Sequence, residues 1–138
     1  MTPDVRAHSF DRPRERPAPG SFTGRDGDGR LYTRSFDRLT LVVAVKPSCD
    51  GCREFVQSSL EELRSVDLVV ISQLPDETGE WRGSAQPVVV APELWAALDI
   101  RSAPFYVLVD PQRERVVTEG VVFAPSQVAG EIAEHLRR

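Results

Sequence analysis

Residues 39–52 read LTLVVAVKPSCDGC, a continuous apolar run that leads directly into a pair of cysteines. The aliphatic and β-branched residues at 39–45 predict a strand that is buried on both faces of a sheet. The stretch REFVQSSLEELR at 53–64 predicts a helix whose apolar side chains share one face, namely Phe55, Val56, Leu60 and Leu63. A buried strand, the cysteine motif and an amphipathic helix are therefore contiguous.

The chain beyond this helix completes the pattern of an α/β domain. DLVVIS at 67–72 predicts a strand that lies parallel to the first through a right-handed crossover. The further predicted elements are a short strand at 88–91, a short helix at 92–100, two antiparallel strands at 105–110 and 115–123, and a closing helix after Pro125. We expect a central mixed β-sheet flanked by helices.

The N-terminal part of the chain has a different composition. The chain has 138 residues, enough for one domain with a core, which we assign to residues 21–138. Residues 1–20 are rich in proline and arginine and predict a flexible arm. The DGDG stretch at 26–29 predicts the turn of an N-terminal β-hairpin. The same letters resemble a calcium loop, but its twelfth position holds Asp37 instead of glutamate and no helices flank it, which favours the turn.

Charge and hydropathy exclude several classes of protein. The formal charge is −4 and the pI is near 5.2, and no clustered basic face is evident, which argues against nucleic-acid and anionic-membrane partners. No stretch approaches the roughly 20 apolar residues of a membrane span, and the first ten residues lack the apolar run of a secretory signal. We expect a soluble, cytoplasmic monomer.

The two cysteines, Cys49 and Cys52, are the only ones in the chain. At the first turn of a helix, residues three apart lie on the same side, so their sulfurs can join and separate with little backbone movement. Cys49 would lie at the helix start, where free amide groups and the helix dipole stabilise a thiolate, which predicts the nucleophile. Cys52, one turn later, would be buried and resolve the mixed disulfide. Lys46 and Arg53 favour the thiolate and Asp50 opposes it.

Two other interpretations of the motif remain. A zinc site needs four ligands, and the only histidines, His8 and His135, lie at opposite ends of the chain, so we predict no metal. The pair can also be an incidental feature of an α/β scaffold. The position of the motif between a buried strand and a helix favours redox chemistry.

Residues 30–138 resemble the thioredoxin-like superfamily, and within it the bacterial TlpA, ResA and MauD types of thiol–disulfide oxidoreductase. The resemblance rests on CDGC at 49–52, SAPFYVLVD at 102–110 and DPQRERVVTEG at 110–120. It implies a thioredoxin-like fold in which Pro104 is a cis-proline that packs on the cysteine pair. It also implies that the backbone of Ala103 binds substrate.

Other positions depart from the pattern of cytosolic thioredoxins. Ser48 replaces a tryptophan before the first cysteine, and Asp50 and Gly51 replace a Gly-Pro pair. We expect Ser48 to contact substrate, and Lys46, Asp50 and Gly51 to tune the redox potential. Val43 stands where thioredoxins bury an acid, so the proton of the second thiol needs another route.

The sequence therefore predicts a dithiol–disulfide oxidoreductase without an organic cofactor, because the two sulfurs carry the electrons. Its substrate would be a disulfide of a protein or small molecule, and an unidentified donor would supply electrons. The lysine at position 46, where peroxiredoxins carry threonine, argues against a peroxidase. The alternative is a non-catalytic redox-sensing or binding module whose CxxC pair switches a partner interaction.

Overall fold

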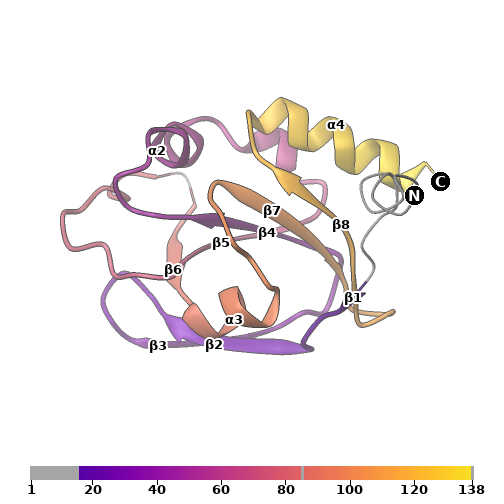
Figure 1. The fold of residues 1–138 in the computed structure, drawn as a ribbon, viewed down its shortest axis with the longest axis horizontal. Coiled ribbons are helices and arrows are strands. Elements are labelled where there is room, and N and C mark those ends of the chain that lie inside the picture. The colour runs from indigo at the N-terminus through magenta and orange to yellow at the C-terminus, as the bar shows by residue number, and fades with distance from the viewer. Residues whose placement is uncertain (1–15, 85, 138) are drawn as a thin grey trace, which may run out of the picture.

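The predicted central strand is β4 (Thr40–Val45), and all six of its residues are buried. The computed structural model describes residues 16–84 and 86–137. Strand β4 pairs in parallel with β5 (Asp67–Ser72) and antiparallel with β7 (Phe105–Asp110), so the sheet is mixed. The parallel pairing confirms the predicted unit of strand, helix and strand (Figure 1).

The described residues form one sheet of eight strands in the order β1-β8-β7-β4-β5-β6-β2-β3. The other strands are β1 (Arg16–Pro17), β2 (Ser21–Arg25), β3 (Leu31–Ser35), β6 (Val88–Val90) and β8 (Arg115–Val121). The helices are α2 (Asp50–Gln57), the 3-10 helix η1 (Glu61–Leu63), α3 (Pro92–Ala97) and α4 (Pro125–Leu136). None of these helices has both the length and the apolar composition needed to cross a membrane.

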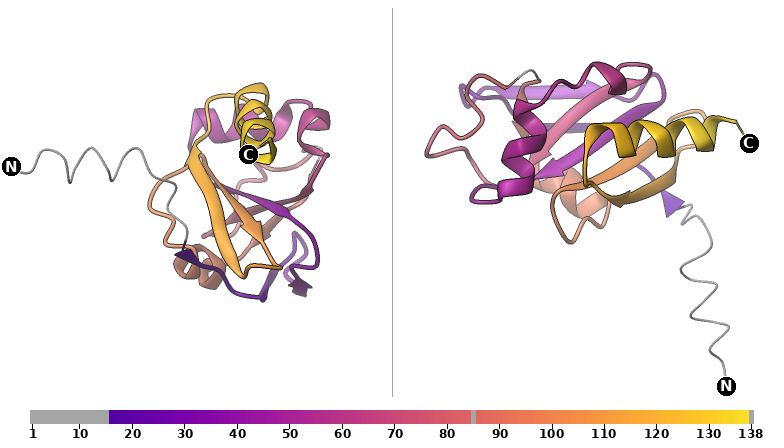
Figure 2. Two further views of the ribbon diagram at one scale, coloured as in Figure 1. Left: turned by 90° about the vertical axis from the view of Figure 1, so that its right-hand side faces the viewer. Right: turned by 90° about the horizontal axis from the view of Figure 1, so that it is seen from above.

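Two apolar cores lie on opposite faces of the sheet because successive side chains of β4 point in opposite directions. Leu41, Val43 and Val45 pack with residues of α2, η1 and α4. Val42 and Ala44 pack with residues of α3 and of the N-terminal strands. Figures 1 and 2 show α2 and α4 on one side of the sheet and α3 on the other.

The predicted hairpin is β2–β3, and it extends the far edge of the sheet. In its turn, the Asp26 carboxylate accepts hydrogen bonds from the backbone N–H groups of Asp28 and Arg30, both at 2.9 Å. Within the described part of the chain, no group of three or more acidic, histidine or cysteine side chains is arranged to hold a metal. Asp26 thus stabilises the turn, as its sequence context predicts.

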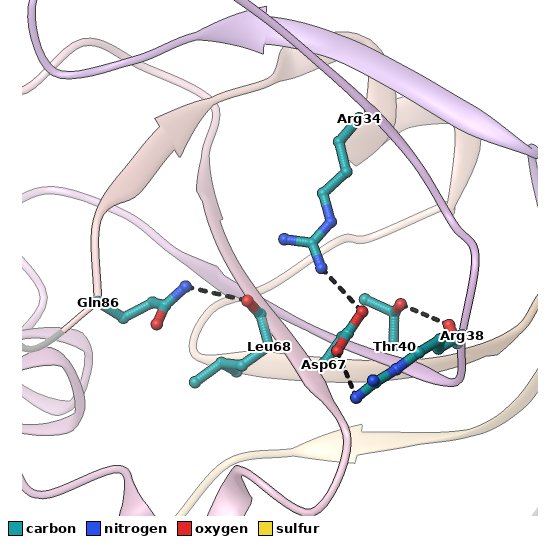
Figure 3. A network of polar contacts seen from close by, with 6 residues as sticks. All are labelled: Arg34, Arg38, Thr40, Asp67, Leu68 and Gln86. Carbon is teal, nitrogen blue, oxygen red and sulfur yellow. Dashed lines mark hydrogen bonds and ion pairs between the residues drawn. The ribbon is translucent and has the colours of Figure 1, made fainter.

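An ion-pair network connects this hairpin to the central strands (Figure 3). The Asp67 carboxylate, at the start of β5, lies 3.1 Å from the Arg34 guanidinium of β3 and 3.0 Å from that of Arg38. Nearby, Gln86 Nε2 donates to the carbonyl oxygen of Leu68 at 3.0 Å. The network lies where β5 begins, at the opposite end of the paired β4 and β5 from the cysteines.

Several boundaries differ from the sequence-based expectation: the helix predicted at 92–100 ends at Ala97, and the strand predicted at 115–123 ends at Val121. Two further differences have a physical reason in the structure. Arg16 and Pro17, assigned to the flexible arm, pair with β8, and Ala18 N donates to Glu114 O, so the chain joins the sheet before residue 21. Residues 1–15 of that arm lie outside the described part. The helix predicted over 53–64 ends at Gln57, because the Ser58 hydroxyl bonds to the Phe55 carbonyl at 2.7 Å and competes with the helical pattern.

Candidate active site: the cysteine pair at the start of α2

The two cysteines lie at the first turn of α2, directly after the loop that follows β4. Cys49 is the N-cap residue, and its Sγ accepts a hydrogen bond from the Cys52 backbone N–H at 3.3 Å. Cys49 is partly exposed and Cys52 is fully buried, and both are free thiols. A reagent in solution can therefore reach Cys49, while Cys52 lies behind it.

Burial determines the acidity of Cys52. Desolvation raises the pKa of its thiol from 9.0 to about 12, and a hydrogen bond with the Cys49 side chain adds to the increase. The Lys46 backbone N–H, which donates to Cys52 Sγ at 3.4 Å, acts in the opposite direction. Cys52 consequently keeps its proton near neutral pH.

The segment before β7 lies against the cysteine turn. Cys49 Sγ is 4.0 Å from the Ala103 carbonyl oxygen, and the Ala103–Pro104 peptide bond is cis. A Cβ atom added to Gly51 would lie 3.5 Å from Pro104 Cγ, so the backbone of the first turn of α2 packs against the proline ring. The fold thus brings Ala103 and Pro104 to the cysteine pair across more than fifty residues of sequence.

Ser48 has a left-handed backbone, with φ of 59°. Its backbone N–H donates to both carboxylate oxygens of Glu80, at 2.9 and 3.2 Å. Glu80 belongs to the loop between β5 and β6, where no sequence motif indicates a function. No spacing or periodicity connects Glu80 with Ser48, so only the fold identifies this contact.

The tuning candidates Lys46 and Asp50 lie on the surface, and Val43, where thioredoxins bury an acid, lies in the core. Asp50 forms an ion pair with Arg53 at 2.6 Å, so the charges of Asp50 and Arg53 largely offset each other beside Cys49. Lys46 is exposed to solvent. Val43 is fully buried in β4 and pairs with Tyr106. The structure therefore places an apolar side chain where thioredoxins bury an acid, as the sequence already indicates.

The arrangement of the sheet, the cysteine turn and the segment before β7 defines a thioredoxin-like fold, as the sequence resemblance predicts. No protein-family model and no curated protein matches the chain. Solved structures do match it. The thioredoxin domain of a thiol-disulfide oxidoreductase from Bacteroides vulgatus superimposes with a TM-score of 0.55 and 20% identity, covering 75% of this chain and 85% of that one.

Two further structures match over a greater share of the chain. A thiol-disulfide oxidoreductase from Bacteroides fragilis has a TM-score of 0.62 and 18% identity, covering 86% of this chain and 98% of its own. StoA from Bacillus subtilis has a TM-score of 0.61 and 16% identity, covering 83% and 98%. At these identities the likeness establishes the fold, and the chemistry has to be argued from the site.

Proposed function

We propose that this protein is a thiol–disulfide oxidoreductase that uses Cys49 as nucleophile and Cys52 as resolving thiol. One observation carries the proposal: the partly exposed Cys49 sulfur lies at a helix N-terminus and accepts the Cys52 N–H, with the buried Cys52 thiol behind it. Amide groups at a helix start favour negative charge on such a sulfur. The matched structures, which include thiol-disulfide oxidoreductases, share the fold that positions this pair.

The first step forms a mixed disulfide. The Cys49 thiolate attacks one sulfur of the substrate disulfide, the substrate S–S bond breaks, and the other substrate sulfur leaves as a thiolate. Cys52 stays protonated during this step, because burial raises its pKa. The buried thiol therefore does not compete with Cys49 for the substrate.

The second step releases the product. Cys52 gives its proton to a substrate thiolate and attacks the Cys49 sulfur, which breaks the mixed disulfide and closes the Cys49–Cys52 bond. The substrate gains two electrons and leaves as two thiols after taking up protons, while the protein is oxidised by two electrons. An external dithiol returns it to the reduced form.

The segment at residues 103–104 is proposed as the docking site for the substrate chain. Ala103 presents its carbonyl oxygen beside the Cys49 sulfur, and Pro104 packs on the turn at Gly51. An extended segment that carries a disulfide can lie along this backbone, as peptides do at strand edges. Ser48, exposed beside Cys49, is proposed to contact the same segment.

Turnover of a disulfide peptide separates this function from a non-catalytic sensing module. The rate of reduction of a fluorescent disulfide peptide by dithiothreitol is measured with catalytic amounts of wild type, Cys49→Ser or Ser59→Ala. Ser59 is the control because it is an exposed serine in the segment after α2. We expect acceleration by wild type and Ser59→Ala, and none by Cys49→Ser. If wild type fails to accelerate the reaction at all, the enzymatic proposal is wrong and the sensing module is favoured.

A further inference from the structure

The loop between β5 and β6 places one carboxylate, that of Glu80, beside the cysteine turn. Both oxygens of Glu80 accept the backbone N–H of Ser48, the residue directly before Cys49, at 2.9 and 3.2 Å. Charge-assisted bonds of this kind are stronger than neutral ones. The bond also holds Ser48 in the left-handed region, with φ of 59°, which non-glycine residues adopt only under local support.

Glu80 is itself held in place by the loop. The Asp76 carboxylate accepts the backbone N–H of Glu80 at 2.7 Å and that of Trp81 at 2.9 Å. The Trp81 side chain is 7% exposed and packs in the apolar core on the same face as Cys52. The backbone around Glu80 is therefore anchored on both sides, so its carboxylate is presented to Ser48 by an ordered turn.

Glu80 differs from the other charged side chains near Cys49, because its carboxylate is hydrogen-bonded to the backbone of the cysteine turn. On α2, Asp50 and Arg53 form an ion pair with each other. Lys46 is exposed on the loop before Cys49, and the 103–104 segment contributes no charged side chain. The Glu80 carboxylate instead accepts a hydrogen bond from the backbone of Ser48, the residue before Cys49.

Resting on the proposed function, we propose that Glu80 is a positioning residue for thiol–disulfide exchange. Its carboxylate fixes the left-handed bend at Ser48, which sets the direction in which Cys49 enters the N-cap position. Its negative charge opposes the build-up of charge on the Cys49 sulfur. The loop at 76–81 thereby sets both the geometry and the reactivity of the nucleophile.

Three variants separate these two effects. Glu80→Gln keeps an oxygen that can accept the Ser48 N–H but removes the charge, and Glu80→Ala removes both. Glu77→Gln is the matched control, because Glu77 is exposed in the same loop and the change in net charge is identical. Circular dichroism establishes that each variant folds.

Amide hydrogen exchange at Ser48 tests the geometry. In Glu80→Ala we expect this amide to exchange about tenfold faster than in wild type, because a hydrogen bond to a charged group is lost. Glu80→Gln and Glu77→Gln should retain most of the protection. Equal exchange rates at Ser48 in wild type and Glu80→Ala would overturn the positioning role.

The pH profile of alkylation by iodoacetamide tests the charge. At pH 6, Glu80→Gln should react at Cys49 about two- to threefold faster than wild type, because the carboxylate no longer repels negative charge on the attacking sulfur. Glu77→Gln should follow wild type across the same pH range. If Glu80→Gln and Glu77→Gln have the same profile, the charge effect is absent.

These readouts do not depend on turnover. If the disulfide peptide assay shows no catalysis but the exchange and alkylation results hold, the enzymatic function is wrong and the role of Glu80 stands. If turnover is present and Ser48 exchange is insensitive to Glu80, the enzymatic function stands and the role of Glu80 is wrong. The two failures are therefore distinguishable.

Discussion

Raising the pH of the reduced protein from 8 to 10 should destabilise it through Cys52. Burial raises the pKa of this thiol from 9.0 to about 12 in the folded protein. At pH 10 the thiol is mostly ionised in the unfolded chain and protonated in the folded chain, so the folded state binds more protons. Stability from this group is present below about pH 9 and is lost as pH rises toward about 12.

The size of the loss follows from the pKa difference. Each pKa unit corresponds to about 1.4 kcal/mol, and pH 10 lies one unit above the ordinary value of 9.0. Between pH 8 and pH 10 the contribution of Cys52 to the free energy of unfolding should therefore fall by roughly 1 kcal/mol. Tyr106 also contributes to the pH dependence, because burial and its hydrogen bond to Glu131 raise the pKa of its hydroxyl group.

Urea unfolding of wild type and Cys52→Ser, each at pH 8 and pH 10 with a phosphine reductant, isolates this contribution. The serine hydroxyl does not titrate in this range and can still accept the Lys46 N–H, while Tyr106 is common to both proteins. The stability of wild type should fall by roughly 1 kcal/mol more than that of Cys52→Ser. Equal losses in the two proteins would refute the assignment of Cys52 as a buried, protonated thiol.

Two glycine substitutions test the packing of the fold and of the site. In Gly24→Ala, the new Cβ would lie 2.5 Å from the Val90 carbonyl oxygen, so we expect a loss of about 1–3 kcal/mol in urea unfolding, and an unchanged midpoint would contradict the close approach of β2 and β6. In Gly51→Ala, the Cβ would make an ordinary contact at 3.5 Å with Pro104, and the helix gains up to about 1 kcal/mol. A lower midpoint for Gly51→Ala would show that this turn has no room against the proline.

The central strand and the cysteine turn could be predicted because their signals are local. A continuous β-branched run at 40–45 favours a strand buried on both faces, and the cysteines follow it directly. Ala103 and Pro104 could be assigned to the site only through the resemblance to thioredoxin-like proteins, because no spacing in the sequence connects them with Cys49. The position of these two residues beside the sulfur depends on the pairing of β7 with β4.

Features that depend on tertiary contacts were not predictable. Arg16 and Pro17 join the sheet because they pair with the edge of β8, which lies about a hundred residues further along the chain. A strand of two residues has no periodic pattern that could predict it. Helix α2 ends at Gln57 because a serine side chain competes for a carbonyl, although the apolar period continues through Leu63. Glu80 stands in a polar loop, and only the fold brings its carboxylate to Ser48.

The central claim is that Cys49 attacks a substrate disulfide and Cys52 resolves the product. Incubation of the Cys52→Ser variant with a disulfide-bonded peptide, followed by mass spectrometry of the proteolysed protein, tests this most directly. We predict a stable mixed disulfide on Cys49, and in wild type the release of free peptide with closure of the Cys49–Cys52 bond. Failure of Cys49 to form a peptide adduct in Cys52→Ser, while the folded variant remains reduced, would contradict the account.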